Sequence, residues 1–401
     1  MQSKGFFKKV ITTSMRAYLL ICMILLAGLL ISCAAEEGEI DWHDGERFVL
    51  MPSPAPSYDD EETPSFSPRA VESPLEFLPF ILPTGPFSRL TGLPIYEEYL
   101  YRRPFAAVIN NSGQALPQSG IASADIIYEV LAEGDVTRLV GIFQSYLPEK
   151  IGPMRSARDY FIDFALNHDA LFIHHGSSPG GYSRINTLRI TNLDGMALEG
   201  SVFWRDRSYP EWAFNTGTRP FEHSSFTGRE RLENHVYNRG IRDYWPSESA
   251  EYGFNFSQMP IQQAELTVDS IFGQAYSIHV PFSALYFRRF VFDPETGLYM
   301  AENRHGTHYD AETGEPVGFA NVLIQLANMR VVDAVGRRTI DTVGSGDGYL
   351  VHGGRYQPVR WVKDSHVSPM RWYYPDGTPL VLQPGRVWIC VFQSSGNVVF
   401  E

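Results

Sequence analysis

The chain has 401 residues, enough for roughly two domains of ordinary size. Apolar residues make up 44% of it, so a sizeable hydrophobic core is available. The formal net charge is −13, and the part after residue 68 is still acidic, which argues against nucleic acid as a partner.

The first 33 residues have the features of a lipoprotein signal. Four basic residues precede an apolar run over 18–31, YLLICMILLAGLLI, which is short for a membrane span and suits a signal peptide. The LISC sequence that ends at Cys33 resembles a bacterial lipobox, where cleavage before the cysteine leaves a thiol that carries a lipid. We therefore expect a signal peptide over 1–32 and a diacylglycerol anchor, with palmitate among its acyl chains, on Cys33.

An acidic tether follows over residues 33–84. Residues 34–68 hold ten acids against one base and are rich in Pro and Ser, which predicts a disordered, extended segment. Loss of the signal removes four bases and no acids, so the net charge becomes −17. Cys22 leaves with the signal and Cys33 is acylated, so Cys390 remains alone and no disulfide is expected within a mature monomer.

Residues 85–250 predict an N-terminal mixed α/β domain, because strand-like and helix-like segments alternate. The predicted strands are 105–111, 124–134, 137–146 and 170–176, of which 124–134 has helix as an alternative. The predicted helices are 156–169, with Ser156 as its N-cap, and a second one near 228–239.

The stretch 201–227 is dense in aromatic residues and arginine and lacks periodicity: SVFWRDRSYPEWAFNTGTRPFEHSSFT. A loop of this length in a compact domain is often functional. Aromatic side chains that seal the edge of a core are the equally weighted alternative.

Residues 256–401 predict a mainly β C-terminal domain, because alternating segments are punctuated by turn sequences such as DPETG, HGG and PDG. YFRRFVFDPETGLYMAEN predicts a hairpin, and VWICVF, which contains Cys390, predicts a buried strand. GSGDGYLVHGG favours a glycine-rich hairpin over a phosphate-binding loop. His305, His308 and Asp310 are assigned to a loop in preference to a site. The overall fold class is therefore α+β or α/β.

Several long strings in this sequence resemble one known family. RRPFAAVINNSGQALPQSGIASADIIYEV and IGPMRSARDYFIDFALNHDALFIHHGSSP resemble the YerB-like lipoproteins of Gram-positive bacteria, as do GYLVHGGRYQPVRWVKD and LQPGRVWICVF. The resemblance covers nearly all of residues 80–399. It implies an anchored extracytoplasmic lipoprotein with tandem N- and C-terminal domains, and it implies no activity.

Arginines supply the strongest chemical signal. Arg155 and Arg158 lie three residues apart at the start of the predicted helix, where free N–H groups already favour anions. Cations there are unfavourable unless a negative group compensates them, so we expect a carboxylate- or phosphate-bearing ligand, held also by Arg138, Arg205 and Arg207. Internal pairing with nearby acids, namely Glu129, Glu133, Asp135 or Asp159, is the alternative, and it is slightly favoured because many acids lie nearby.

Histidines add a weaker signal. His174 and His175 follow a predicted strand and precede a loop of small residues, and His223 lies in the aromatic stretch. Ligands often bind at the carboxyl ends of strands in α/β sheets. No metal-ligand or nucleophile motif accompanies these histidines, so we expect neither a metal nor a cofactor.

These observations lead to one main hypothesis. The protein is expected to sit on the outer face of the cytoplasmic membrane and to bind a cell-wall ligand or an envelope protein. The binding site would be an Arg/His-lined cleft between residues 152–180 and 201–227, and an enzyme is the less favoured class. One alternative is a hydrolase of wall polymer with His174 or His175 as base. The other is an interaction scaffold for wall-synthesis or lytic enzymes.

Overall fold

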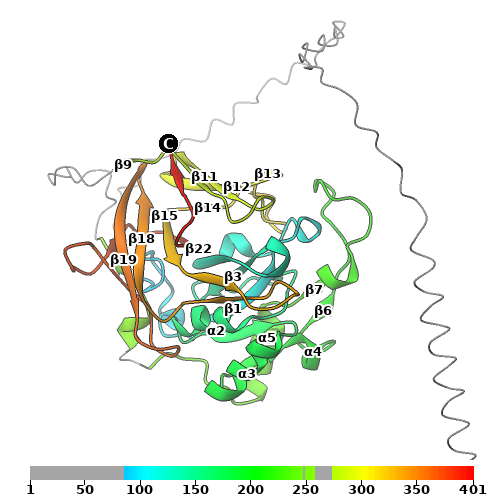
Figure 1. The fold of residues 1–401 in the computed structure, drawn as a ribbon. Coiled ribbons are helices and arrows are strands. Elements are labelled where there is room, and N and C mark those ends of the chain that lie inside the picture. The colour runs from blue at the N-terminus through cyan, green and yellow to red at the C-terminus, as the bar shows by residue number, and fades with distance from the viewer. Residues whose placement is uncertain (1–84, 247–248, 258–272) are drawn as a thin grey trace, which may run out of the picture. The chain divides into compact units, whose positions relative to one another are not determined.

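The computed structural model describes residues 85–246, 249–257 and 273–401. The predicted signal peptide, the acidic tether and Cys33 lie outside the described residues. The described residues belong to one compact unit, shown in Figure 1.

A large mixed sheet organises this unit. Its N-terminal strands are β1 (Phe105–Asn110), β2 (Ile126–Leu131), β3 (Thr137–Phe143), β4 (Leu171–His174) and β5 (Asn192–Asp194). Its C-terminal strands are β9 (Gly273–Gln274), β15 (Asn321–Ala327), β18 (Gly344–His352), β19 (Arg355–Lys363), β20 (Arg371–Tyr373) and β22 (Val387–Gln393). The order is β20-β19-β18-β15-β22-β2-β3-β1-β4-β5, with β9 paired to β19. The four predicted strands of the N-terminal region are thus confirmed.

Strand β22 joins the two parts of the sheet. It lies between β15 and β2 and runs parallel to both. Strands buried on both faces have continuous apolar sequences, and β22 carries the VWICVF run. Val387 through Phe392, Cys390 included, are all buried, which confirms the predicted buried strand.

A second, antiparallel sheet contains the predicted hairpin. Its strands are β10 (Ser277–Val280), β11 (Arg288–Asp293), β12 (Leu298–Asn303), β13 (Gly306–Thr307), β14 (Gly318–Phe319) and β23 (Val399–Phe400). β11 and β12 pair in antiparallel register across the DPETG turn, which confirms the hairpin.

Three two-stranded ladders complete the strands. They are β6 (Trp204–Arg205) with β7 (Ser225–Phe226), β8 (Asn255–Phe256) with β21 (Val381–Leu382), and β16 (Met329–Val331) with β17 (Arg338–Ile340). The glycine-rich stretch before Arg355 forms the β18–β19 hairpin, as predicted.

The α-helices among the described residues are short and lie in the N-terminal region. They are α2 (Asp159–Leu166), α3 (Pro179–Leu188), α4 (Gly195–Leu198) and α5 (Arg229–Asn238). Short 3-10 turns occur at Glu97–Tyr99, Gly113–Ala115, Ile121–Ser123, Glu133–Asp135, Phe221–His223 and Ser249–Tyr252. Helix α5 matches the helix predicted near 228–239.

The start of α2 differs from the prediction. The N-cap residue is Arg158, and Ser156 does not cap the helix. The preceding residues are held extended, because His175 N donates to Arg155 O and Ala157 N donates to Gly176 O. This pairing with the chain after β4 delays the helix to Asp159.

Helix α3 is absent from the predicted elements because its first residues, Pro-Gly-Gly, indicate a loop. Ser178 caps it by accepting a hydrogen bond from Gly181 N at 3.1 Å, and Pro179 occupies the first turn, where its missing N–H costs nothing.

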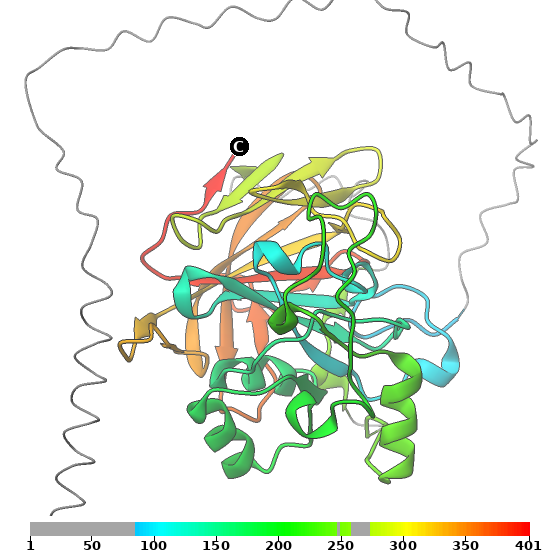
Figure 2. The ribbon, with the colours of Figure 1, turned by 90° about the vertical axis from the view of Figure 1, so that its right-hand side faces the viewer.

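The large sheet lies between the helices and the second sheet, as Figure 2 shows, and a hydrophobic core packs on each of its faces. One core packs α2 side chains such as Tyr160 and Phe164 against Val108 and Ile389 of the sheet. The other packs Phe290 and Tyr299 of the second sheet against the opposite face, which includes Trp388. The fold class is confirmed, with a mixed α/β N-terminal region followed by a mainly β region. The two regions share one continuous sheet.

Candidate functional site

Arg138 and Arg158 share one carboxylate. Arg138 Nη2 lies 3.0 Å from Glu133 Oε1, and Arg158 Nε donates to Glu133 Oε2 at 2.8 Å. Both guanidinium groups are largely buried, and desolvation lowers the pKa of Arg138 to about 10. The alternative of internal ion pairing therefore describes these two arginines.

Arg155 differs from them. Its Nη1 donates to the backbone oxygen of Glu222 at 2.9 Å, and within the described part of the chain it has no carboxylate partner. Desolvation lowers its pKa, and the neighbouring charge of Arg138 lowers it further. Arg155, in the first predicted segment, thus contacts Glu222 in the second.

Arg205 and Arg207 are engaged elsewhere. Arg205 makes two hydrogen bonds to Glu199, at 2.8 and 3.2 Å, and its guanidinium stacks 4.1 Å from the centre of the Phe221 ring. Arg207 Nε donates to the backbone oxygen of Arg219 at 2.8 Å.

The histidines of the predicted cleft are bonded within the protein. His174 is fully buried, with Nδ1 2.8 Å from Gly176 O and Nε2 3.1 Å from Asn192 Oδ1. His175 Nδ1 lies 2.8 Å from Ser225 Oγ and its Nε2 lies 3.0 Å from Arg205 Nη2. His223 Nδ1 lies 2.6 Å from Asn110 Nδ2. Burial lowers the pKa of His175 and of His223, so both favour the neutral form.

The two predicted segments thus meet, through Arg155–Glu222 and His175–Ser225, but their polar groups mostly satisfy one another. A ligand role for these residues stays a prediction. An open pocket is lined in part by Trp212 and Phe214 of the aromatic stretch 201–227, which we call the aromatic loop.

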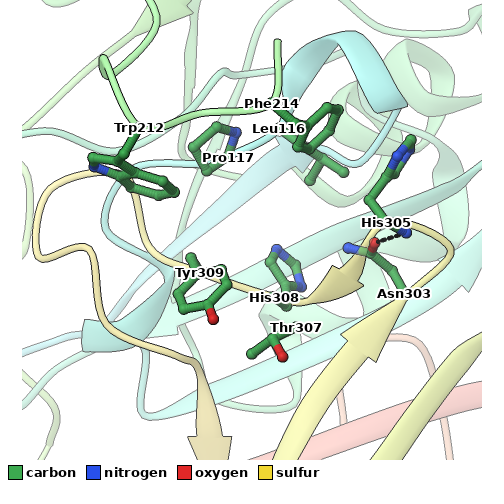
Figure 3. Close-up of a pocket in the computed structure, with 9 residues that line it drawn as sticks. All are labelled: Leu116, Pro117, Trp212, Phe214, Asn303, His305, Thr307, His308 and Tyr309. Atoms are coloured by element: carbon green, nitrogen blue, oxygen red, sulfur yellow. Dashed lines mark hydrogen bonds between the residues drawn. The ribbon is translucent and has the colours of Figure 1, made fainter. Parts of the chain in front are cut away.

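This hollow, which we call the aromatic pocket, has a volume of about 210 Å³. Three segments build it: the turn near residue 116, the loop around residue 213, and the chain from β12 to residue 309 (Figure 3). Its lining residues are Leu116, Pro117, Trp212, Phe214, Asn303, His305, Thr307, His308 and Tyr309.

Aromatic rings form its walls. Trp212 and Tyr309 meet edge to face, with centroids 5.9 Å apart and planes at 70°. Phe214 stacks on His305, with centroids 4.5 Å apart and planes at 14°. Trp212, Phe214 and Tyr309 remain 49%, 54% and 40% exposed, so much of their apolar surface is available for a ligand.

Polar groups without a hydrogen-bond partner also belong to residues that line the pocket. Figure 3 draws one hydrogen bond between lining residues, from His305 N to Asn303 Oδ1 at 2.8 Å. Within residues 85–246, 249–257 and 273–401, no hydrogen-bond partner meets Asn303 Nδ2, Thr307 Oγ1, Tyr309 Oη or the Trp212 indole N–H. An apolar pocket with a few convergent polar groups is the usual form of a small-ligand site.

His308 also lines the pocket, but it is buried and both of its ring nitrogens have partners. Its Nδ1 lies 2.8 Å from Arg288 Nη1, and its Nε2 lies 2.6 Å from Gln118 Oε1. Burial and the Arg288 charge hold the pKa of His308 well below its usual range. His308 is therefore a neutral ring of the pocket lining, held in place by Arg288 and Gln118.

Side chains of the aromatic loop donate hydrogen bonds to backbone oxygens of residues 113–116 and so hold the loop in place. Asn215 Nδ2 donates to Gly113 O and Leu116 O, each at 2.8 Å, and Tyr209 Oη donates to Gln114 O at 2.8 Å. Arg219 is buried, and its Nη1 donates to Ala115 O at 2.6 Å. The walls are thus preorganised before any ligand arrives.

The sequence identified part of this site. The aromatic stretch 201–227 was predicted as a functional loop or an edge seal, and it supplies two walls. His305 and His308 were assigned to a loop only, and Leu116 and Pro117 carried no signal. The density of Trp, Tyr and Phe beside proline was the available clue.

The structure offers no group of three or more His, Cys, Asp or Glu side chains suited to a metal among the residues it describes. Over the same residues, no helix is long and apolar enough to cross a membrane.

Comparison with known proteins gives a consistent result. Residues 90–242 match the N-terminal domain, and residues 278–389 the C-terminal domain, of a family described as "Protein of unknown function (DUF3048)". The Bacillus subtilis (strain 168) protein named "Putative lipoprotein YerB" is 32% identical over 306 residues, which cover 75% of this chain and 84% of that protein. The crystal structure of YerB from Bacillus subtilis matches with a TM-score of 0.67 at 28% identity, over 79% of this chain and 99% of that one. This chain therefore belongs to the YerB-like lipoprotein family, whose two DUF3048 domains have no known function.

Proposed function

We propose that this protein is a lipid-anchored lipoprotein on the outer face of the cytoplasmic membrane, and that it binds a component of the cell envelope in the aromatic pocket. The lipobox ending at Cys33 and the lipoprotein name of its relative support the anchor. The acidic, Pro- and Ser-rich residues after Cys33 suit a tether.

One observation carries the binding proposal. Three half-exposed aromatic side chains, Trp212, Phe214 and Tyr309, line one pocket together with polar groups that have no partner within the described residues. Exposed apolar surface of this kind marks interaction sites, because its burial by a ligand is favourable. This argument shifts the expected binding site from the Arg/His cleft to the aromatic pocket.

The contacts of His174 and His175 give less support to the hydrolysis of wall polymer with either histidine as base. A general base needs a free ring nitrogen within reach of substrate. Both nitrogens of His174 are bonded inside the protein, and those of His175 lie against Ser225 Oγ and Arg205 Nη2. Binding without turnover is the function that we propose.

The test is sedimentation of the purified full chain, in detergent, with isolated Gram-positive cell walls. We expect the parent protein to co-sediment and the double variant Trp212→Ala, Phe214→Ala to stay mostly in solution. Tyr237→Ala is the matched control, because Tyr237 is 86% exposed on α5 and lies outside the pocket lining. Equal sedimentation of the parent and the double variant would contradict the proposal, as would release of soluble sugar from the walls.

A further inference from the structure

We propose that the aromatic pocket takes one pyranose ring of a wall polymer, and that Arg304 binds a carboxylate carried by that sugar. This inference rests on the proposed function and names the chemical class of its ligand.

The arrangement of lining groups suits a sugar ring. A pyranose presents an apolar C–H face and a rim of hydroxyl groups, so it needs aromatic surface and hydrogen-bonding groups side by side. Trp212 and Tyr309 provide the surface on one side of the pocket. Asn303 Nδ2 and Thr307 Oγ1 provide a free donor and a free acceptor on its other side, near His305 and His308 (Figure 3).

The size of the pocket limits the ligand. Its volume of about 210 Å³ lies below the range of roughly 300–1,000 Å³ that is typical of pockets enclosing drug-sized molecules. The pocket therefore suits a single ring, with the rest of a longer molecule outside it.

A positive charge lies beside this ring position. Arg304 lines a small adjoining cavity that shares Leu116, Asn303 and His305 with the aromatic pocket. Arg304 is exposed, and within the described ranges its side chain has no ion pair and no hydrogen bond. The other arginine of that cavity, Arg288, is already paired with Glu129.

The unpaired guanidinium of Arg304, next in sequence to Asn303 of the aromatic pocket, favours a negative group on the ligand. A guanidinium binds a carboxylate through parallel N–H···O bonds, which add direction as well as charge. A neutral wall sugar would leave Arg304 without any role in recognition.

Two matched probes test the carboxylate. N-acetylmuramic acid and N-acetylglucosamine share one ring, and only the first carries a lactyl carboxylate. We expect the full chain in detergent to bind the acid roughly tenfold more tightly in a calorimetric titration, because a charge-assisted hydrogen bond is the stronger kind. Glucuronic acid, as a third probe, separates a uronic-acid polymer from a muramyl unit.

Single variants test which side chain binds the carboxylate and which binds the sugar ring. Arg304→Gln should abolish the preference for the acid and leave N-acetylglucosamine binding unchanged, whereas Trp212→Ala should weaken both sugars. Arg239→Gln is the control, because Arg239 is an exposed arginine beyond the end of α5. Equal binding of the two sugars by the parent, or an unchanged preference in Arg304→Gln, would overturn the carboxylate assignment.

The failure of this inference differs from the failure of the proposed function. If walls bind through Trp212 and Phe214 but none of the three sugars binds, the sugar class is wrong and the pocket remains a wall-binding site. A proline-rich peptide that bound instead of the sugars would identify a protein ligand. If neither walls nor sugars bind, the proposed function itself falls.

Discussion

Arg288 Nε lies 2.8 Å from Glu129 Oε2, and the two side chains are 0% and 1% exposed, so they form a completely buried ion pair. Glu129 is on β2 of the large sheet and Arg288 is on β11 of the second sheet. Thr137 and Asn111 also donate to Glu129, at 2.9 and 3.1 Å, and Arg288 contacts His308. The pair therefore links the two sheets, and Arg288 also contacts His308, which lines the aromatic pocket.

Breaking this pair should destabilise the protein strongly. Arg288→Met leaves the Glu129 charge buried without its partner, which typically lowers the free energy of unfolding by about 3–5 kcal/mol. Urea unfolding measures the loss. Arg289→Met is the control, because Arg289 pairs with Glu302 at a half-exposed site, where about 1 kcal/mol or less is expected. Similar losses for the two variants would show that the buried pair has no special role.

His168 should make stability depend on pH in the acid range. It is fully buried, with Nε2 2.8 Å from Tyr128 Oη and Nδ1 2.8 Å from Tyr252 O, and burial lowers its pKa from 6.5 to about 4. Between these values the unfolded chain binds more protons than the folded one, so stability falls as the pH drops from 6.5 to 4.

The variant His168→Gln removes this group. We expect the slope of unfolding free energy against pH in that window to decrease by up to about 1.4 kcal/mol per pH unit, which is the value for one proton. Denaturant titrations at a series of pH values measure the slope. Identical slopes for parent and variant would mean that His168 does not titrate differently in the folded state.

Cys390 should be chemically inert until the protein unfolds. It is fully buried on β22, and burial raises the pKa of its thiol well above the usual range, so little reactive thiolate forms. In a variant with Cys22 and Cys33 replaced by serine, a thiol reagent should label Cys390 only in denaturant. Fast labelling of the native protein would contradict the burial of β22.

Arg219 should hold the aromatic loop closed. It is buried, donates to Ala115 O at 2.6 Å, and its guanidinium stacks 4.3 Å from the centre of the Tyr209 ring. Arg219→Ala should make the chain between residues 209 and 219 more sensitive to limited proteolysis and weaken wall binding at least severalfold. Arg239→Ala should change neither property, and unchanged cleavage in Arg219→Ala would remove the loop-holding role.

Cys33 should decide where the protein resides in the cell. Cys33→Ser removes the sulfur that would carry the lipid, so we expect the protein to move from the membrane fraction to the soluble fraction or the medium. Fractionation followed by immunoblotting measures this. A serine variant that remained with the membrane after washing in salt would show that another feature anchors the chain.

Much of the local structure could be predicted from the sequence. Continuous apolar runs predicted β1 and β22, and both are buried on the sheet interior. Helical spacing predicted α2 and α5, although Ser156 does not cap α2 because residues 155–157 are paired with the chain after β4. These features depend on residues close in sequence, where periodicity and burial are directly linked.

Only the tertiary structure decided how these elements combine. The placement of β22 between β2 and β15 joins residues more than 250 positions apart in the sequence, and no local pattern specifies such a pairing. The arginines show the same limit. Their sequence spacing suggested a ligand site, but the fold brings Glu133 against both Arg138 and Arg158. Among the residues that the structure describes, it leaves Arg155 and Arg304 without an ion pair. Charge compensation and pocket formation depend on which distant side chains meet, so composition and spacing predicted the lipoprotein signal and the strands, and the fold alone determined which groups line the pocket.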